Sequence, residues 1–257
     1  MPERYENIII TQRDLDIIHF VFNSQGCKSV HIKDKFFKNC IYKTAMARIK
    51  SLCDAGFILG ERRYANGPIV YCIRRKGVKL LIKYGKVKQT VIKLPHITTS
   101  RIDHDFDVLD VRIALESDAV LSIGEWITEY EISSKIRKGY PGNKYLWVPD
   151  GAFTISRGLF KRPFLLEYIS RYCGKEILVK TLNTIEYRYP YYSVLIVGGN
   201  QLVANSCYRV LVNRGKWLGK YLLTWKDSII KYMENPLKAT TNSGNMTTTN
   251  SAIKATT

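Results

Sequence analysis

The sequence has no apolar run that approaches the roughly 20 residues needed to cross a bilayer. Its first ten residues, MPERYENIII, carry charges and a short apolar stretch of three isoleucines, so they do not form a signal peptide. These two absences exclude membrane-spanning and signal-directed proteins, and we expect the chain to act in the cytoplasm without a membrane partner.

Metal-binding and nucleotide-binding signatures are also missing. The six cysteines lie far apart and form no C-x-x-C pair, so a structural zinc site is excluded and reduced, packed thiols are expected. The four histidines are isolated, and G-x-S-x-G, phosphate-loop and G-x-G-x-x-G motifs are absent. The residues concerned are Cys27, Cys40, Cys53, Cys72, Cys173, Cys207, His19, His31, His96 and His104.

Positive charge is what the sequence has in excess. The chain of 257 residues carries 40 basic and 22 acidic side chains, a formal net charge of +18. Residues 1–90 hold 18 Lys or Arg and seven Asp or Glu, whereas residues 103–131 hold nine carboxylates beside Arg112 alone. Because neutralised phosphates release condensed counterions, a protein this basic favours nucleic acid, and the N-terminal third is the predicted contact region.

The N-terminal third follows the element order of a winged helix. A helix is expected from Thr11, a second over 29–37 with Val30, Ile32, Phe36 and Phe37 inward, and a third over 42–54. Two β-like runs, 57–64 and 68–75, meet at Asn66-Gly67, a strong hairpin signal. The segment IKSLCDAGFI is similar to the juncture between recognition helix and wing in many winged-helix proteins.

In such folds the third helix enters the major groove of duplex DNA and the wing lies against the backbone. The third predicted helix keeps its polar side chains away from an apolar stripe of Ala45, Ile49, Leu52 and Cys53. The residues predicted to contact double-stranded DNA are Lys43, Thr44, Arg48, Lys50 and Ser51 of this helix, and Arg62, Arg63, Arg74 and Arg75 of the hairpin.

The remainder alternates helical and strand-like patterns, which predicts an α/β domain. Helices are expected over 77–85, 101–117 and 175–188, strands over 126–132, 147–155, 163–170 and 191–199, a basic loop over 135–145, and an amphipathic stretch over 217–233. The last 20 or so residues are rich in Thr, Asn and Ser and are predicted to be disordered. The predicted division is a winged-helix domain over 1–92, a mixed-sheet domain over 93–236 and a tail over 237–257.

Two carboxylates stand out in the second domain. Asp150 follows a proline at the start of one predicted strand, and Glu167 interrupts the apolar run FLLEYI of the next. A carboxylate in an apolar strand is costly unless a cation or another partner compensates it. Oxygen ligands on paired strands suit Mg²⁺ or Mn²⁺, which activates water for attack on a phosphate. A turn aspartate and a strand glutamate paired with an arginine is the alternative.

The order of these pieces resembles the PD-(D/E)xK, or restriction-endonuclease-like, nuclease superfamily. More narrowly, it is similar to the plasmid replication-relaxation family and MobC-type mobilisation relaxases, which pair a winged helix with a degenerate nuclease domain. The segments that carry the resemblance are RIDHDFDVLDVRIAL, Trp126 to Glu129, PDGAF, LLEYI and the helix with Glu176, Lys180 and Tyr187. The resemblance implies Asp150, Glu167 and Lys180 as catalytic residues, with Glu129 a third metal ligand.

The sequence departs from the nuclease pattern where a lysine is expected, because Ile169 stands two residues after Glu167. Lys180, or Lys175, on the following helix is the substitute that the resemblance implies. An ion pair between Glu176 and Lys180 is the alternative role for that lysine. Tyr140, Tyr168 and Tyr187 are weak options for a tyrosine nucleophile, and His104 is expected to cap or pack.

Three functions compete on this sequence. The first is a relaxase, a metal-dependent endonuclease that nicks DNA at the origin of a plasmid or mobile element. Such an enzyme would start conjugation, mobilisation or replication together with other mobilisation or replication proteins. The second is a catalytically inactive winged-helix DNA binder that acts as a replication initiator, accessory factor or repressor. The third is a structural winged-helix adaptor whose basic charge is incidental.

Overall fold

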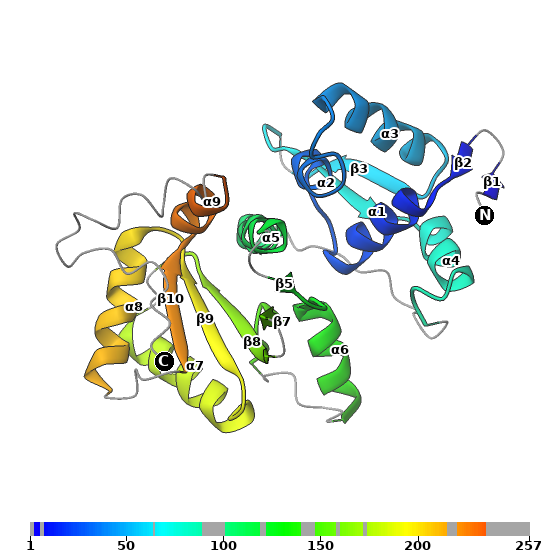
Figure 1. The fold of residues 1–257 in the computed structure, drawn as a ribbon. Coiled ribbons are helices and arrows are strands. Elements are labelled where there is room, and N and C mark those ends of the chain that lie inside the picture. Colours follow the sequence, from blue (N-terminus) through cyan, green and yellow to red (C-terminus); the bar gives the residue numbers. More distant parts are fainter. Residues whose placement is uncertain are drawn as a thin grey trace. The chain divides into compact units, whose positions relative to one another are not determined.

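The computed structural model (Figure 1) describes residues 3–5, 8–63, 65–88, 101–118, 122–139, 147–157, 160–171, 174–214 and 220–234. The chain divides into two compact units, Met1–Leu109 and Asp110–Thr257. The predicted boundary between residues 92 and 93 and the predicted tail over 237–257 lie outside the described residues. The fold is a mixed α/β fold, and no helix in the described ranges is both long and apolar enough to span a membrane.

The first unit begins with a short hairpin and three helices. Strands β1 (Glu3–Tyr5) and β2 (Ile8–Ile10) pair antiparallel, and the three helices α1 (Gln12–Asn23), α2 (Ser29–Phe36) and α3 (Tyr42–Asp54) follow. The sequence did not predict β1 or β2, which have only three residues each. Thr11 caps α1 as expected, through a capping box with Asp14.

Helix α3 ends where the sequence placed its end. Gly56 has a φ of 77°, its N–H donates to the carbonyl of Cys53, and the N–H of Phe57 donates to the carbonyl of Leu52. These two bonds make a Schellman motif, which needs a residue in the left-handed region and therefore favours glycine. The motif turns the chain sharply into the strand that follows.

A hairpin and a fourth helix complete the first unit. Strands β3 (Ile58–Arg62) and β4 (Ile69–Ile73) pair antiparallel, and α4 (Arg75–Lys83) follows at once. Cys27 adds a short antiparallel bridge to Tyr71 of β4, which ties the loop between α1 and α2 to the hairpin. A Cβ atom on Gly77 would lie 2.4 Å from the carbonyl oxygen of Phe57, so only glycine lets α4 pack this closely.

The core of the first unit lies between these elements, and most of the predicted apolar positions are buried in it. Val30 is an exception, because its side chain is 41% exposed and His31 is buried in its stead. Fully buried members of the core are Ile17, Ile18, Val21, Ile32, Ala45, Leu52, Phe57, Ile58, Val70 and Leu81.

The second unit is built on a six-stranded mixed sheet in the order β10-β9-β8-β7-β5, with β6 also paired to β7. Strands β7 (Gly151–Arg157) and β8 (Phe160–Ile169) are antiparallel, whereas β8, β9 (Ser193–Gly198) and β10 (Tyr221–Trp225) run parallel. The helices α7 (Lys175–Arg188) and α8 (Gln201–Asn213) make the parallel crossovers. Helix α7 spans the predicted range, and α8 is a helix that the sequence patterns did not reveal.

The two faces of this sheet are covered differently. Residues of α7 and α8 share one apolar cluster with inward residues of β7, β8 and β9, so both helices cover the same face (Figure 1). On the other face Phe153 stacks on Phe164 and on Trp126, and the guanidinium of Arg112 lies 5.4 Å from the Trp126 ring. Arg112 belongs to α5 (Ile102–Ser117), which begins in the first unit and continues into the second.

Two segments of the second unit differ from the sequence prediction. The predicted strand 126–132 is only β6 (Ile127–Thr128), and α6 (Glu129–Gly139) begins immediately after it. The predicted basic loop 135–145 therefore starts inside a helix, and its part from 140 on lies outside the described residues. The stretch 217–233 contains β10 and then α9 (Lys226–Glu234), not one amphipathic element, while β5 (Ser122–Ile123) forms a short edge of the sheet.

Candidate functional site

Helix α3 presents a polar and basic outer face. Ala45, Ile49 and Leu52 are buried against the first unit, as the sequence predicted. The opposite face is exposed and includes four residues with small or cationic side chains, Lys43, Thr44, Ala47 and Lys50. Ile41 and Tyr42 at the start of the helix are also exposed, by 71% and 50%. This face combines positive charge with small side chains that allow close approach to another surface.

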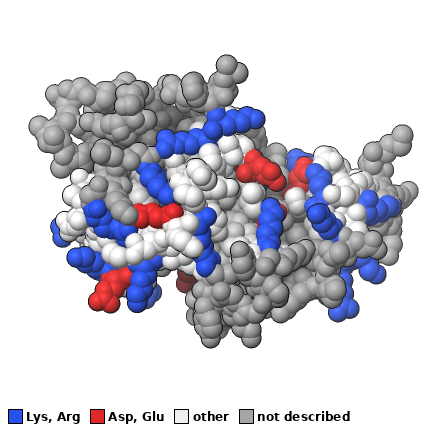
Figure 2. All heavy atoms as spheres, turned by 90° about the horizontal axis from the view of Figure 1, so that it is seen from below, with Lys and Arg blue, Asp and Glu red and all other residues white. Residues whose placement is uncertain are grey.

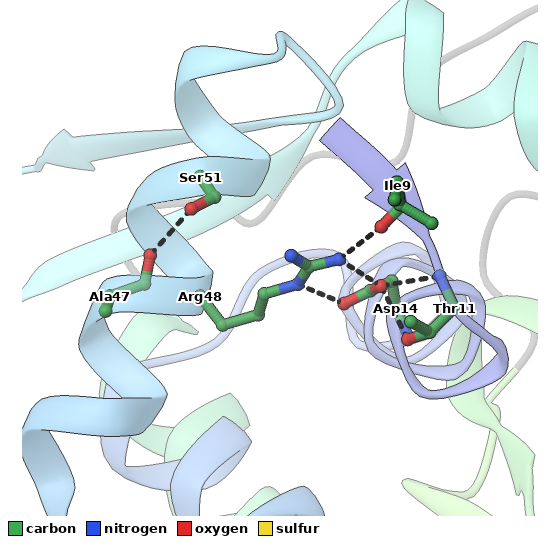
Figure 3. A network of polar contacts seen from close by, with 6 residues as sticks. All are labelled: Ile9, Thr11, Asp14, Ala47, Arg48 and Ser51. Carbon is green, nitrogen blue, oxygen red and sulfur yellow. Dashed lines mark hydrogen bonds and ion pairs between the residues drawn. The ribbon is translucent and has the colours of Figure 1, made fainter. Parts of the chain in front are cut away.

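Arg48 does not belong to that outer face, although the sequence placed it among the DNA contacts. Its Nε donates to Oδ1 of Asp14 at 2.7 Å, and its Nη2 donates both to Asp14 and, at 2.7 Å, to the carbonyl of Ile9 (Figure 3). The guanidinium therefore joins α3 to the start of α1 and to β2. The helical pattern put Arg48 at the margin of the apolar stripe, and its partner lies 34 residues away in the sequence, where periodicity cannot reveal it.

Asp14 is fully buried and has donors besides the arginine. The backbone N–H and the hydroxyl of Thr11 donate to its Oδ2 at 2.7 and 2.6 Å. Burial by itself would raise the pKa of this carboxyl, but the hydrogen bonds from Arg48 and Thr11 outweigh it and hold the pKa below its ordinary value. Asp14 is thus a charged anchor that fixes α3 relative to α1.

Ser51 also has a structural hydrogen bond. Its hydroxyl donates to the carbonyl of Ala47 at 3.0 Å, within the same helix, and the residue is half-buried (Figure 3). Lys43, Thr44 and Lys50 are therefore the predicted contact residues of α3 that lie on its exposed face.

The arginines assigned to the hairpin lie at its two ends. Arg62 pairs with Ile69 near the turn, and Ile58 pairs with Ile73 at the base of the hairpin. The two pairs are four residues apart, which is about 13 Å along a strand. Arg74 and Arg75 follow β4 at that base, where Arg74 is the N-cap residue of α4. Arg62 and Arg63 thus lie near the tip of the hairpin, Arg74 and Arg75 are exposed at its base, and the DNA contacts predicted for all four stay predictions.

The two tip arginines differ in how they are held. Arg62 is exposed and donates to the carbonyl of Gly67 at 3.4 Å. Arg63 is half-buried, lies 2.9 Å from a carboxylate oxygen of Glu61, and donates to the sulfur of Cys72. Figure 2 shows that lysine and arginine side chains outnumber carboxylates on the face in view. Arg62 is the tip residue better placed to meet a phosphate.

The second candidate site is the carboxylate pair of β7 and β8. Gly151, the first residue of β7, pairs with Leu166 of β8, and Asp150 comes immediately before β7. Asp150 is hydrogen-bonded to the backbone of Leu166 and Tyr168, the two residues that flank Glu167. Ala152 and Leu165 share one apolar cluster, and because alternate residues of a strand share a face, Glu167 of β8 lies on that side of the sheet. Glu167 thus lies in a strand as predicted, Asp150 lies just before the partner strand, and the roles assigned to both stay predictions.

Protein donors already engage this pair. Asp150 is 9% exposed, its Oδ2 accepts the backbone N–H of Tyr168 at 2.7 Å, and its own N–H donates to the carbonyl of Leu166. Glu167 is half-buried, and its Oε1 accepts the indole N–H of Trp147 at 3.4 Å. No sequence pattern pointed to a role for Trp147, because it lies 20 residues from Glu167 and the contact arises only on folding.

The third predicted metal ligand does not join the pair. Glu129 is the first residue of α6, and the described residues contain no cluster of three or more Asp, Glu, His or Cys side chains able to hold a metal. Mg²⁺ can bind a protein through only one or two carboxylates while it keeps several of its waters. Asp150 and Glu167 would suffice for such a two-carboxylate site, but not for a site with three protein ligands. Any metal held there would supply Lewis-acid chemistry to a phosphate.

The predicted lysines do not converge on the carboxylates. Helix α7 buries Leu178, Leu182 and Ile185, while Lys175 and Lys180 are exposed on its outer side. The expected ion pair between Glu176 and Lys180 is not formed either, although both residues are described. Ile169, at the usual lysine position, is buried in the core beside α7. Both lysines face solvent in the described part of α7, and the catalytic role that the resemblance implied for Lys180 stays a prediction.

The remaining predicted options are placed as follows. Tyr168 is buried in β8 and Tyr187 is exposed at the end of α7, while Tyr140 lies outside the described residues. Nδ1 of His104 lies 3.2 Å from a carboxylate oxygen of Asp105, which agrees with a packing or capping role. The cysteines that the structure describes are free thiols, as expected: Cys27, Cys40, Cys53, Cys72 and Cys207.

Known proteins resemble this chain only weakly. No protein-family model matches the chain, and no curated protein matches it. Among solved structures it has a likeness to the restriction endonuclease FokI, with a TM-score of 0.28 and 13% identity over 89% of this chain and 44% of that one. The chain thus corresponds to less than half the length of that enzyme, and at this TM-score the likeness establishes neither a fold nor a function.

Proposed function

We propose that this protein binds double-stranded DNA through a winged helix formed by residues 11–83, with α3 as the recognition helix and the tip of the β3–β4 hairpin as the wing. The observation that carries the proposal is the outer face of α3. Lys43, Thr44 and Lys50 are exposed around the small Ala47, while Arg48 is turned inward to hold the helix. The element order of three helices and a hairpin, and the net charge of +18, support it.

Two kinds of residue on the outer face of α3 would have different roles in DNA binding. A helix that enters the major groove needs small or polar side chains toward the bases and cations toward the flanking phosphates. Thr44 and Ala47 suit the first task, and Lys43 and Lys50 the second. A protein of this kind would act in the cytoplasm as a replication initiator, accessory factor or repressor of a plasmid or mobile element.

The test compares two double variants in duplex binding. Lys43→Gln with Lys50→Gln should weaken binding and lower the slope of log K against log salt by about two units, roughly 0.9 for each phosphate that is no longer neutralised. Lys79→Gln with Lys88→Gln removes the same charge from exposed residues of the same unit outside α3. The control should keep most of the slope. An equal fall in affinity for both variants would show that binding depends on net charge alone and would contradict the recognition helix.

A metal-dependent site-specific nickase, or relaxase, acting at an origin is the second candidate function. The observation that favours it is that Asp150 is hydrogen-bonded to the backbone of Leu166 and Tyr168, which flank Glu167 on β8. The exposed Lys180 and the position of Glu129 outside any ligand cluster of the described residues favour the inactive binder. In a nuclease the chain's own residues would hold the attacked phosphate beside the two carboxylates, with Trp147 orienting Glu167.

Nicking of supercoiled plasmid DNA separates the two candidates. With Mg²⁺ or Mn²⁺ the nickase should open supercoiled plasmid, chelator should stop it, and Asp150→Asn should abolish it while duplex affinity stays within a few-fold. Glu125→Gln is the matched control, because Glu125 is an exposed carboxylate of the same unit. Cleavage that survives in Asp150→Asn would rule out this site, and no cleavage of origin-bearing plasmid with either metal would leave the DNA binder as the function.

A further inference from the structure

A tyrosine-rich segment covers the last two residues of α7 and the turn that leads to β9. We call residues 187–192, with the sequence Tyr-Arg-Tyr-Pro-Tyr-Tyr, the tyrosine turn. Tyr187 is 87% and Tyr191 90% exposed. Tyrosine normally buries most of its ring, so two nearly bare rings within five residues form an unusual feature that packing of the unit does not explain.

The base of the tyrosine turn is fixed. The ring of Tyr189 makes edge-on contacts with Trp147 and Tyr192, at centroid distances of 6.2 and 5.8 Å. The N–H of Tyr192 donates to the carbonyl of Tyr189, and Pro190 occupies the second position of this four-residue turn, where its fixed φ is favourable. The turn hydrogen bond and the fixed φ of Pro190 restrict the backbone around the exposed Tyr191, which lowers the backbone entropy lost when its ring makes a contact.

The charge around the exposed rings is positive. Arg188 is exposed between the two tyrosines, and Lys180 is exposed seven residues before Tyr187, about two helical turns along the same side of α7. The neighbouring carboxylate of Glu186 is already engaged, since it accepts the hydroxyl of Tyr221 at 2.8 Å and lies 3.3 Å from Arg214. The surface therefore combines exposed aromatic rings with the positive charges of Arg188 and Lys180, which Glu186 does not neutralise.

We propose that the tyrosine turn binds single-stranded nucleic acid. Unpaired bases stack on the rings of Tyr187 and Tyr191, Arg188 neutralises a phosphate between them, and Lys180 neutralises a phosphate further along the strand, beyond Tyr187. Every base has a π-face, so such a platform binds without strong sequence preference, and exposed aromatic rings interleaved with cations are the chemistry it needs. A duplex cannot use it, because its bases are already stacked and paired.

One side chain connects the platform to the carboxylate pair. Trp147 contacts Tyr189 at the base of the tyrosine turn and donates to Glu167 through its indole N–H. The turn and the pair are therefore joined through a single indole ring. The proposal does not rest on duplex binding by α3 or on nuclease activity, since single-strand binding is measured separately from both.

The experiment measures fluorescence anisotropy of labelled oligodeoxythymidine and oligouridine with the full chain and its variants. Tyr187→Ala with Tyr191→Ala should weaken binding by at least about fivefold for each ring, with the salt slope unchanged, since stacking involves no counterion release. Tyr187→Phe with Tyr191→Phe keeps both rings and should bind like wild type. Arg188→Gln should lower the salt slope by about 0.7, the value for one phosphate of a single strand.

Several results would overturn the proposal. They are wild-type binding to neither oligonucleotide, undiminished binding by the alanine double variant, and an equal loss of affinity in the phenylalanine variant. The first would point to a protein partner for the exposed rings. Duplex affinity should stay unchanged in all three variants, and a parallel fall there would show that the turn is not specific for single strands. Binding of one oligonucleotide alone identifies whether the strand is DNA or RNA.

Discussion

The ion pair between Arg48 and Asp14 changes the role of one residue from contact to positioning. Both residues hold α3 at a defined place against α1 and β2, so the outer face of α3 is presented in one orientation. Arg48 is 27% exposed and Asp14 fully buried, which protects the pair from much of the screening that weakens surface ion pairs. Removal of either side chain leaves the other without its best partner.

We predict that Asp14→Asn lowers the free energy of unfolding by about 1–3 kcal/mol at neutral pH, the cost of breaking a buried charge-assisted bond. Asp16→Asn is the control: Asp16 is 41% exposed and 3.4 Å from Nζ of Lys86, and an exposed pair contributes about 0–1 kcal/mol. Denaturant unfolding of the three proteins checks this. A larger destabilisation in the Asp16 variant would contradict the anchoring role of Asp14.

The same pair predicts a pH dependence. The pKa of Asp14 is lower in the folded protein than in the unfolded chain, so its contribution is present above the unfolded value, about 4. It disappears as the pH falls through the folded pKa. The difference in unfolding free energy between wild type and Asp14→Asn should therefore shrink as the pH is lowered below about 4. A difference that stays constant over that range would show that Asp14 is not the titrating anchor.

Among the elements, α6 shows how a cap signal can be hidden inside a strand-like pattern. The segment after Trp126 is rich in β-forming residues, which predicts a strand through 132. In the structure the N–H and hydroxyl of Thr128 donate to Glu131 at 2.9 Å each, and the N–H of Glu131 donates back to the hydroxyl. This is a capping box, and the Thr-x-x-Glu spacing that encodes it was present in the sequence.

Removal of the Thr128 cap should destabilise the second unit. We predict that Thr128→Ala costs about 1 kcal/mol, within the usual range for an N-cap threonine. Ser134→Ala, inside the same helix, should be neutral or slightly stabilising, because alanine has the higher helix propensity. Thermal and denaturant unfolding measure both effects. If Ser134→Ala were as costly as Thr128→Ala, the destabilisation would not come from the cap.

At the scale of the whole molecule, the first unit extends beyond the predicted domain boundary. Phe106 in α5 lies with its ring centroid 5.6 Å from that of His31, and Nζ of Lys28 lies 4.6 Å from the centroid of the same phenylalanine ring. These contacts fall within the first compact unit, which ends at Leu109. A fragment that stops at residue 92 would leave this side of α2 without its aromatic partner.

We therefore predict that a fragment of residues 1–117 melts at a higher temperature than a fragment of residues 1–92. Both should bind duplex DNA, since α3 and the hairpin are complete in each. Phe106→Ala in the longer fragment should remove most of its advantage, which assigns the difference to that ring and not to chain length. Equal melting temperatures for the two fragments would favour the boundary at residue 92.

The sequence alone determined those features whose cause is local. The cap at Thr11, the end of α3 at Gly56, the range of α7 and the paired strands β7 and β8 follow from periodicity, caps and turn residues within a few positions of one another. The net charge and the absence of known motifs can also be read from the sequence without a structure. For these elements the structure agrees with the prediction from the sequence.

Only the tertiary structure decided what depends on partners distant in the chain. It paired Arg48 with Asp14, turned Lys180 to solvent, kept Glu129 out of the carboxylate pair and placed Trp147 against both Glu167 and Tyr189. A side chain's orientation is set by the elements packed around it, and residues far apart in sequence carry no signal of that contact in a single chain. Residue type thus indicated which groups could bind DNA, and packing decided which of them face solvent and are free to do so.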